Sequence, residues 1–188
     1  GGLFHPCGGS VRFRGDELTE RRFADATFNG SFRRRVGIVF QNSDVQLFTS
    51  RVEDELLFGL EQLGLPAGEC ADRARKYAGV MGVGHLLGRH PQNLSIGEKK
   101  RVAIASVLAM EPEVLILDEP TAGLDPTTSR HLIDAINEFS SRGATVITAT
   151  QDIHLVPEVA ERVVVMSADK TVVRTGGVDA VLADTPFL

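Results

Sequence analysis

The segment from Leu94 to Pro126 constrains the fold of this chain more than any other part of the sequence. It opens with Ser95-Ile96-Gly97-Glu98, and S-x-x-E before an apolar run is the capping box that starts a helix. The residues that follow, as far as Met110, are mostly apolar and predict a buried helix. The apolar run Val114–Leu117 then predicts a buried strand, which ends in the carboxylate pair Asp118-Glu119.

Helices and strands are expected to alternate around this segment, which favours an α/β fold with a parallel sheet. Runs such as VLIL and VVVM are typical of strands that are buried on both faces. The expected strands are Ser10–Arg14, Val36–Phe40, Val114–Leu117, Thr145–Thr150, Arg162–Met166 and Lys170–Arg174. A first helix is expected to begin near Arg51. The other expected helices are Glu69–Val80, Ser95–Met110, Pro126–Ser141, His154–Ala160 and Val178–Ala183.

Composition narrows the class of protein. The 188 residues give room for one domain with a sizeable core, and 43% hydrophobic content is typical of globular chains. A net charge of −5 argues against electrostatic attraction to nucleic acid or anionic lipid, so Arg33-Arg34-Arg35 is interpreted as a solvated turn. Cys7 and Cys70 lie far apart and the histidines form no close pair, which indicates neither a disulfide framework nor a zinc site.

The pair Asp118-Glu119 carries the clearest chemistry. A strand that ends in two carboxylates places them at the carboxyl edge of a parallel sheet, where ligands bind. Successive strand residues point in opposite directions, so one carboxylate can hold Mg²⁺ and the other can orient or deprotonate a water molecule. The alternative is a solvated pair that ends the strand before Pro120.

Two helix starts allow both a structural and a functional interpretation. Ser95 caps its helix, and the same helix end offers free N–H groups and a positive dipole end to a phosphate. Asp125 followed by Pro126 is an ordinary helix start, with aspartate as the cap and proline at the first helical position.

These motifs together resemble the ATP-binding subunits of ABC transporters. LSIGE (Leu94–Glu98) resembles the signature motif, VLILDE (Val114–Glu119) a Walker B strand, AGLDP (Ala122–Pro126) a D-loop and VFQN (Val39–Asn42) a Q-loop. The resemblance covers nearly the whole chain and is closest to cobalt, nickel and energy-coupling-factor importers. It implies a P-loop NTPase-like parallel sheet, formed by residues 1–50 and 93–188, with a small helical subdomain at residues 51–92.

The resemblance also implies roles for individual residues, with ATP and Mg²⁺ as cofactors. Asp118 would hold Mg²⁺, Glu119 would act on the attacking water, and Gln41 would touch both. Ser95, Gly97 and Glu98 would meet the ATP held by a second subunit, and Asp125 would link the two sites of the dimer. Ile96 stands where many relatives have glycine. The segment Asn42–Phe58 would face a groove that receives a helix of a transmembrane partner.

The sequence departs from the family pattern at the phosphate loop. A motif G-x-x-x-x-G-K-[ST] is absent, and none of the four lysines follows a glycine. Because GGLFHPCGGSV (Gly1–Val11) resembles the segment just after that loop, a truncated start is expected rather than a subunit that never had the loop. The loop's strand would lie between Thr145–Thr150 and Arg162–Met166. Poor ATP binding is expected of these 188 residues.

Gln151 is the second departure, since the resembling switch region carries histidine there. Glutamine donates hydrogen bonds but cannot carry the proton or the positive charge of an imidazole. Impaired turnover at this site is therefore expected.

The sequence favours an ATP-hydrolysing subunit of a cobalt, nickel or vitamin importer. It would be cytoplasmic, dimeric and held at the inner face of the membrane by its partner. No run approaches the roughly 20 apolar residues that cross a bilayer. One alternative is a catalytically degenerate subunit that lends its signature motif to another chain. Another is a soluble ABC ATPase that acts on nucleic acid, but Arg51–Gln92 has neither the coiled-coil heptads nor the zinc cysteines of that class.

Overall fold

The computed structural model of the chain describes residues 8–183. The chain divides into two compact units, Gly1–Thr148 and Ala149–Leu188. Gly1–Cys7, the start of the segment expected to follow a phosphate loop, lies outside the described residues.

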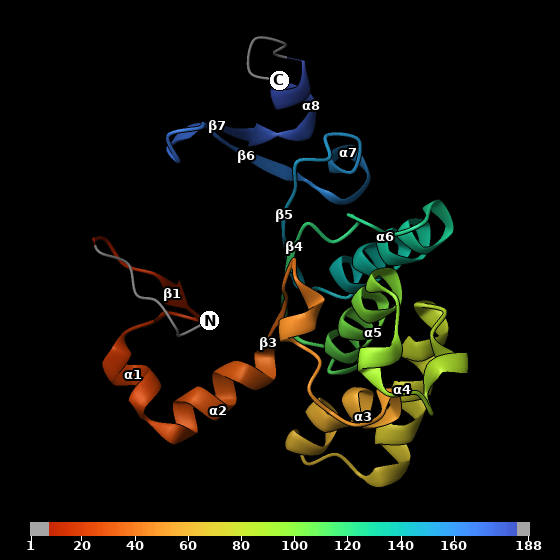
Figure 1. Cartoon of the computed structure of the whole chain (residues 1–188). Coiled ribbons are helices and arrows are strands. Elements are labelled where there is room, and N and C mark those ends of the chain that lie inside the picture. Colours follow the sequence, from red (N-terminus) through yellow and green to blue (C-terminus); the bar gives the residue numbers. More distant parts are fainter. Residues whose placement is uncertain (1–7, 184–188) are drawn as a thin grey trace. The chain divides into compact units, whose positions relative to one another are not determined.

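A three-stranded sheet forms the centre of the first unit (Figure 1). Its strands are β3 (Val36–Val39), β4 (Val114–Asp118) and β5 (Thr145–Ala149), in that order across the sheet. β3 and β4 are parallel, and their register pairs Val36 with Val114 and Val39 with Leu117. The expected α/β class with a parallel sheet is confirmed.

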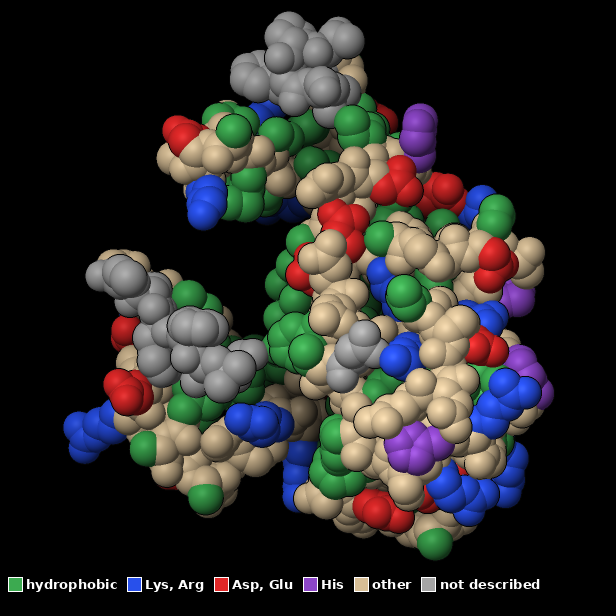
Figure 2. Space-filling model, in the orientation of Figure 1, with side chains coloured by type: hydrophobic (Ala, Val, Ile, Leu, Met, Phe, Trp, Pro, Cys, Tyr) green, Lys and Arg blue, Asp and Glu red, His purple; other side chains and the backbone are tan. Residues whose placement is uncertain are grey.

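The two faces of this sheet differ in burial. Val39, Leu115 and Leu117 are buried, whereas Ile116 is half-buried and Ile147 is 53% exposed. Figure 2 shows hydrophobic side chains gathered over the β3–β4–β5 sheet on the viewed face. The expectation that both faces are buried is therefore wrong for the described residues, because helix packing covers one face only.

Helix α5 (Ile96–Ala109) packs against the sheet and against the helices that precede it. Its close approach to β3 depends on Gly37, where a Cβ would lie 2.7 Å from a methyl group of Val107. α3 (Val52–Gln62) and α4 (Ala67–Val80) contact α5 and each other, and short turns η2 (Gly84–Leu86) and η3 (Pro91–Asn93) follow. The apolar core here includes Leu56, Leu60, Met81, Leu86, Ile104 and Leu108, all fully buried. The assignment of residues 51–92 to a separate subdomain stays a prediction.

The stretch before β3 contains more structure than the sequence pattern predicts. β1 (Arg12–Phe13) and β2 (Asp16–Glu17) form a hairpin with a turn at Arg14-Gly15, so the observed strand is shorter than the expected Ser10–Arg14. α1 (Glu20–Ala24) and α2 (Ala26–Arg35) follow, where no helix was expected. Side-chain caps by Thr19 and Asp25 start these helices, and both lack a regular apolar stripe. Arg33-Arg34-Arg35 form the last turn of α2 rather than a loop.

Helix α6 (Pro126–Ser141) has the bounds expected of it and is amphipathic. Its buried residues recur at helical spacing and are Thr128, Leu132, Ile133, Ala135, Ile136 and Phe139. Short turn η1 (Ser43–Val45) follows β3.

The second unit is a small α/β element. β6 (Arg162–Met166) pairs antiparallel with β7 (Val172–Gly177), and α8 (Val178–Leu182) packs on both strands. The last strand begins and ends later than the expected Lys170–Arg174, because Lys170 lies in the turn before it. The backbone of Lys170 has a φ of 65°, and its N–H donates to the Ser167 carbonyl at 2.9 Å. α7 (Val156–Val159) is shorter than the expected His154–Ala160, since Pro157 stands in its first turn. Among the described strands, β5 pairs with β4 and β6 with β7, and none bridges β5 to β6.

Candidate functional site

The start of α5 has the capping box that the sequence predicts. The Ser95 hydroxyl oxygen accepts from the Glu98 N–H at 3.3 Å, and the Glu98 carboxylate accepts from the Ser95 N–H at 2.8 Å. Ser95 is exposed, and the first-turn N–H groups of Ile96 and Gly97 have no carbonyl within the helix to bond. This end therefore presents donors and a positive dipole to solvent, as anion binding requires.

The carboxylate pair lies where β4 leaves the sheet. Asp118 is the last residue of the strand and is exposed, while Glu119 is half-buried. The backbone of Glu119 has a φ of 46°, in the left-handed region that residues other than glycine rarely adopt. Such conformations concentrate at functional sites and are held there by the surrounding contacts. The two acidic side chains thus leave the strand through a tightly defined bend.

Gln41 leaves the sheet from the same edge. β3 and β4 run parallel with Val39 paired to Leu117, so the residues after each strand emerge side by side. Gln41 is exposed two residues beyond β3, and Asp118 directly follows Leu117 in β4. The structure therefore groups Gln41, Asp118 and Glu119 at one edge, as the sequence predicts for a parallel sheet.

Asp125 caps α6. Its carboxylate accepts from the Thr128 N–H at 3.0 Å and from the Thr128 hydroxyl at 2.6 Å. The hydrogen bonds from Thr128, first from the hydroxyl and then from the N–H, hold the pKa of Asp125 below its ordinary value. The structural role expected of Asp125-Pro126 is confirmed, and Asp125 remains exposed for contact with another molecule.

The signature-like helix start and the loop after β4 lie against each other. A Cβ at Gly97 would lie 3.4 Å from the carbonyl oxygen of Gly123, an ordinary van der Waals distance, so the two segments are in contact there. The loop itself is a pair of tight turns, with hydrogen bonds from Ala122 N–H to the Glu119 carbonyl at 3.3 Å and from Leu124 N–H to the Thr121 carbonyl at 3.0 Å. Ser95, Gly97, Glu98, Asp118, Glu119 and Asp125 thus belong to two contacting segments.

Gln151 belongs to the second unit and follows β5 by two residues. It is exposed and lies in a turn in which the Asp152 N–H donates to the Thr150 hydroxyl and the His154 N–H donates to the Asp152 carboxylate, both at 3.0 Å. His154 is exposed on the same turn.

Three buried or half-buried polar residues with structural contacts were not identified from the sequence. Lys100 in α5 donates to backbone carbonyls of the loop after β4. Gln46 accepts from the Phe40 N–H and donates to the Ala103 carbonyl, both at 3.3 Å. Glu55, only 4% exposed, accepts from the N–H groups of Phe48 and Thr49. A signal for Lys100 existed, since helical spacing puts it on the face of the apolar residues three, four and seven positions later.

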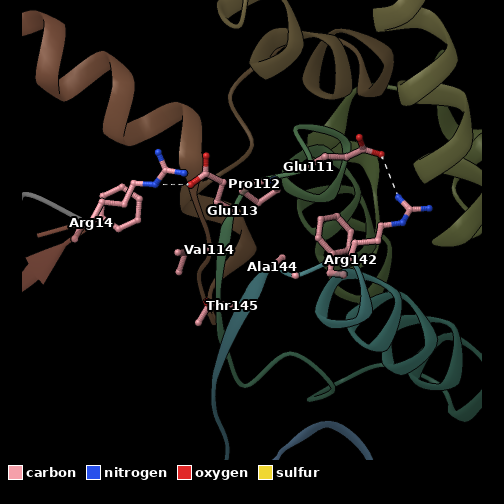
Figure 3. Close-up of a pocket in the computed structure, with 11 residues that line it drawn as sticks. Arg14, Glu111, Pro112, Glu113, Val114, Arg142, Ala144 and Thr145 are labelled. Carbon is pink, nitrogen blue, oxygen red and sulfur yellow. Dashed lines mark ion pairs between the residues drawn. The ribbon is translucent and has the colours of Figure 1, made fainter.

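A cavity of about 470 Å³ lies at the opposite edge of the sheet, where β4 and β5 begin (Figure 3). Its charged groups pair with each other: Arg14 with Glu113 at 3.1 Å and Arg142 with Glu111 at 3.9 Å. The residues that line it are Phe13, Arg14, Glu111, Pro112, Glu113, Val114, Phe139, Arg142, Gly143, Ala144 and Thr145. None of the sequence-predicted site residues contributes to this cavity.

Within residues 8–183, no three His, Cys, Asp or Glu side chains gather as a metal-binding group. In the same range, no helix combines the length and the apolar character needed to cross a membrane.

Comparisons with known proteins identify the family. The chain matches the family described as ABC transporter over residues 1–122. It is 46% identical over 190 residues to the nickel import ATP-binding protein NikO of Rhodobacter capsulatus, and the match covers all of this chain and 74% of that protein. It is 42% identical over 188 residues to the energy-coupling factor transporter ATP-binding protein EcfA of Methanoculleus marisnigri, covering all of this chain and 65% of that protein.

A solved structure gives the same result. The cbiO1 protein of Clostridium perfringens, part of the ABC transporter complex cbiONQ, superposes with a TM-score of 0.78 at 37% identity, covering 98% of this chain and 72% of that one. With its helix start, carboxylate pair and capping aspartate in the order described above, the chain belongs to the ABC transporter ATP-binding proteins.

Proposed function

We propose that this chain is the ATP-hydrolysing subunit of an importer for a transition-metal ion or a vitamin, working as a dimer bound to a transmembrane partner. Membership in the ABC family implies ATP binding, and the relatives named for nickel import and for an energy-coupling factor support the importer type. The single observation that carries the proposal is the contact between the α5 start and the loop that begins at Glu119.

The donor set at the edge of the sheet fits Mg²⁺. Mg²⁺ prefers oxygen ligands and is commonly held by one or two carboxylates together with waters and substrate phosphates. Asp118 and Gln41 offer a carboxylate and an amide oxygen, both exposed at this edge. When bound, the ion would neutralise charge on the phosphates of ATP. Asp118 and Gln41 would hold it, while Glu119 would orient or deprotonate the attacking water.

The start of α5 would bind phosphate oxygens of the ATP that a second subunit holds. Ser95 would donate its hydroxyl proton, and the N–H groups of Ile96 and Gly97 would donate from the backbone. Ile96 is 79% exposed at this end, where the second subunit would cover it. Asp125 would meet the second subunit beside it.

The transmembrane partner would dock on an apolar surface formed by Val45, Phe48 and Phe58, here called the docking surface. These side chains are 72%, 65% and 43% exposed, and the rings of Phe48 and Phe58 pack edge to face with centroids 4.9 Å apart. Gln46 ties the same segment to α5, and Glu55 ties it to α3. A helix pressed against this surface would therefore be mechanically connected to the α5 start. Through such a partner, the subunit would be held at the inner face of the membrane.

A second candidate is a catalytically degenerate subunit that lends its α5 start to another chain's ATP. Gln151 favours it, because glutamine cannot carry a proton in the way the histidine expected there can. For the 188 residues by themselves, which contain no G-x-x-x-x-G-K-[ST], we predict weak ATP binding. A micromolar affinity in calorimetry would contradict that prediction.

The test uses the protein expressed from its complete gene, assembled with its transmembrane subunit. Glu119→Gln should lower the ATPase rate by about 100-fold or more, because it removes the group that acts on water, while ATP binding stays. If Glu119→Gln leaves the rate unchanged and Gly97→Asp abolishes it, the degenerate subunit is the correct function. If neither variant changes the rate, the proposed function is wrong.

A further inference from the structure

Lys100 is a charged side chain placed in the interior. It lies in the second turn of α5 and is only 4% exposed. A buried ammonium is costly unless hydrogen bonds and opposite charges compensate it. Both are present, since its Nζ donates to the Glu119 carbonyl at 2.5 Å and to the Ala122 carbonyl at 2.7 Å.

Both carbonyls belong to the bend that carries the candidate catalytic carboxylate. Glu119 has its φ of 46°, and its carbonyl accepts from the Ala122 N–H as well as from Lys100. A carbonyl oxygen has two lone pairs, so these two donors satisfy it fully. The ammonium therefore closes the turn from Glu119 to Ala122 at both ends, and it holds the backbone in a conformation that the local sequence does not favour.

The electrostatic surroundings keep the cation in place. Burial lowers the pKa of Lys100 below its ordinary value, whereas the carboxylates of Glu119 and Asp118 raise it. The same ammonium thus attracts the two acidic side chains that the proposed mechanism uses. Loss of its charge would release both the backbone turn and these carboxylates.

We propose that Lys100 is a positioning residue, which fixes the backbone of Glu119 and so couples the α5 start to the carboxylate edge within one chain. This inference rests on the proposed function, in which the α5 start serves the ATP held by the partner subunit and Glu119 serves the ATP of its own subunit. A shift of α5 at one ATP would then move Glu119 at the other.

The first test reads the turn directly, without ATP. Hydrogen exchange of the amides in residues 119–124 should speed up by about tenfold or more in Lys100→Met, because the turn loses both hydrogen bonds that Lys100 donates to its carbonyls. Lys100→Gln keeps a donor on a shorter stem and should show a smaller increase. The matched control is Lys99→Gln, which removes the same charge one residue earlier in α5 and should stay within about twofold of wild type. Unchanged exchange in folded Lys100→Met or Lys100→Gln overturns the inference, whatever the ATPase result.

The second test separates positioning from simple packing. In the complete transporter, Lys100→Met should lower kcat by about 10- to 100-fold with little change in KM, since a misplaced catalytic group loses rate rather than binding. In a background lacking Cys7 and Cys70, Lys100→Cys should lose rate equally. Because position 100 is buried, this cysteine is aminoethylated in the denatured subunit before refolding and assembly, and the product, close to lysine in length, should restore the rate. The inference is overturned if aminoethylation does not restore the ATPase rate, or if Lys100→Met changes KM and leaves kcat unchanged.

The proposed function and the role of Lys100 can be refuted independently of each other. If the wild-type complex hydrolyses no ATP while the exchange result holds, the proposed function fails and Lys100 still positions the turn. If the complex hydrolyses ATP and exchange is unchanged in the variants, the role of Lys100 fails alone.

Discussion

Ser95 donates two hydrogen bonds of 2.8 Å to one carboxylate oxygen of Glu98, from its backbone N–H and from its hydroxyl. The hydroxyl proton that a phosphate would need is therefore directed at Glu98 in the same helix turn. The bonds from the Ser95 N–H, and then from its hydroxyl, hold the pKa of Glu98 below its ordinary value of 4.5.

The first prediction concerns acid stability. A carboxyl group whose folded-state pKa is lowered stabilises the protein above its unfolded pKa, and that stabilisation is lost as pH falls through the folded-state value. Glu98→Gln should therefore cost about 0.5–1 kcal/mol of unfolding free energy at pH 7, because a neutral acceptor replaces a charged one. The difference from wild type should shrink as pH falls below 4.5. Urea denaturation at a series of pH values measures it.

The matched control is Glu61→Gln, an exposed residue of α3. It should stay within about 0.5 kcal/mol of wild type at neutral pH. A gap between wild type and Glu98→Gln that widens in acid would contradict the assignment of the charged capping box as stabilising.

The second prediction concerns the loop that carries the docking surface. The buried carboxylate of Glu55 accepts from the N–H groups of Phe48 and Thr49 at 3.1 and 3.0 Å. Glu55→Ala leaves both donors without this acceptor and should cost about 2 kcal/mol of unfolding free energy. It should also reduce transport more than ATP hydrolysis, since the docking surface loses its anchor to α3.

Glu53→Ala provides the comparison for Glu55, because it removes a carboxylate from the same first turn of α3. Glu53 pairs with Arg51 at 3.4 Å and both side chains are about half exposed, so the loss should be below about 0.5 kcal/mol. Equal losses in the two variants would show that helix-end charge, rather than the loop anchor, is what Glu55 supplies.

The structure of the segment from Leu94 to Pro126 could be predicted from the sequence because interactions between residues close in the chain determine it. The capping box at Ser95, the helix start at Asp125 and the apolar periodicity of α6 each depend on neighbours within a few residues. The parallel pairing of β3 with β4 followed from two apolar runs joined by helices, and it brings the residues after both strands, Gln41 and Glu119 among them, to one edge of the sheet.

Features that depend on distant residues escaped the sequence interpretation. The bond from Lys100 to Glu119 joins residues 19 positions apart, and no local pattern predicts it. The helices α1 and α2 lack a regular apolar stripe, and their aromatic side chains Phe23, Phe28 and Phe32 pack mainly on each other. Ile116 is likewise only half-buried. Its burial depends on which helices cover the sheet, and the composition of the strand does not reveal that.

The third prediction concerns Gln151. In the complete transporter, Gln151→His should raise the ATPase rate, because imidazole adds a titratable group where glutamine offers only an amide. An increase of about 100-fold would match the low end of what a positioned proton-transfer group contributes. Steady-state phosphate release measures it, with His154→Gln as the comparison that should have little effect. An unchanged rate in Gln151→His would show that this position does not limit turnover.

The last prediction uses Tyr77, which is the only tyrosine in a chain without tryptophan. Its hydroxyl donates to the Glu111 carboxylate at 2.8 Å, and burial together with this bond raises its pKa above the ordinary value of 10.0. A raised folded-state pKa gives stability that is fully present below pH 10 and is lost as pH rises further. Tyrosinate absorbance of the native protein should therefore appear only above pH 10, whereas the urea-unfolded chain should titrate near it.

Tyr77→Phe tests the same bond through stability. It should cost about 1 kcal/mol of unfolding free energy at pH 7, since Glu111 loses one donor but keeps Lys76 at 3.3 Å and Arg73 at 3.3 Å. The cost should diminish above pH 10, because there the wild type alone loses the stability that its raised pKa supplies. A native phenol that ionises at the same pH as the unfolded one, or a cost that grows in alkali, would mean that Tyr77 and Glu111 do not share this proton in solution.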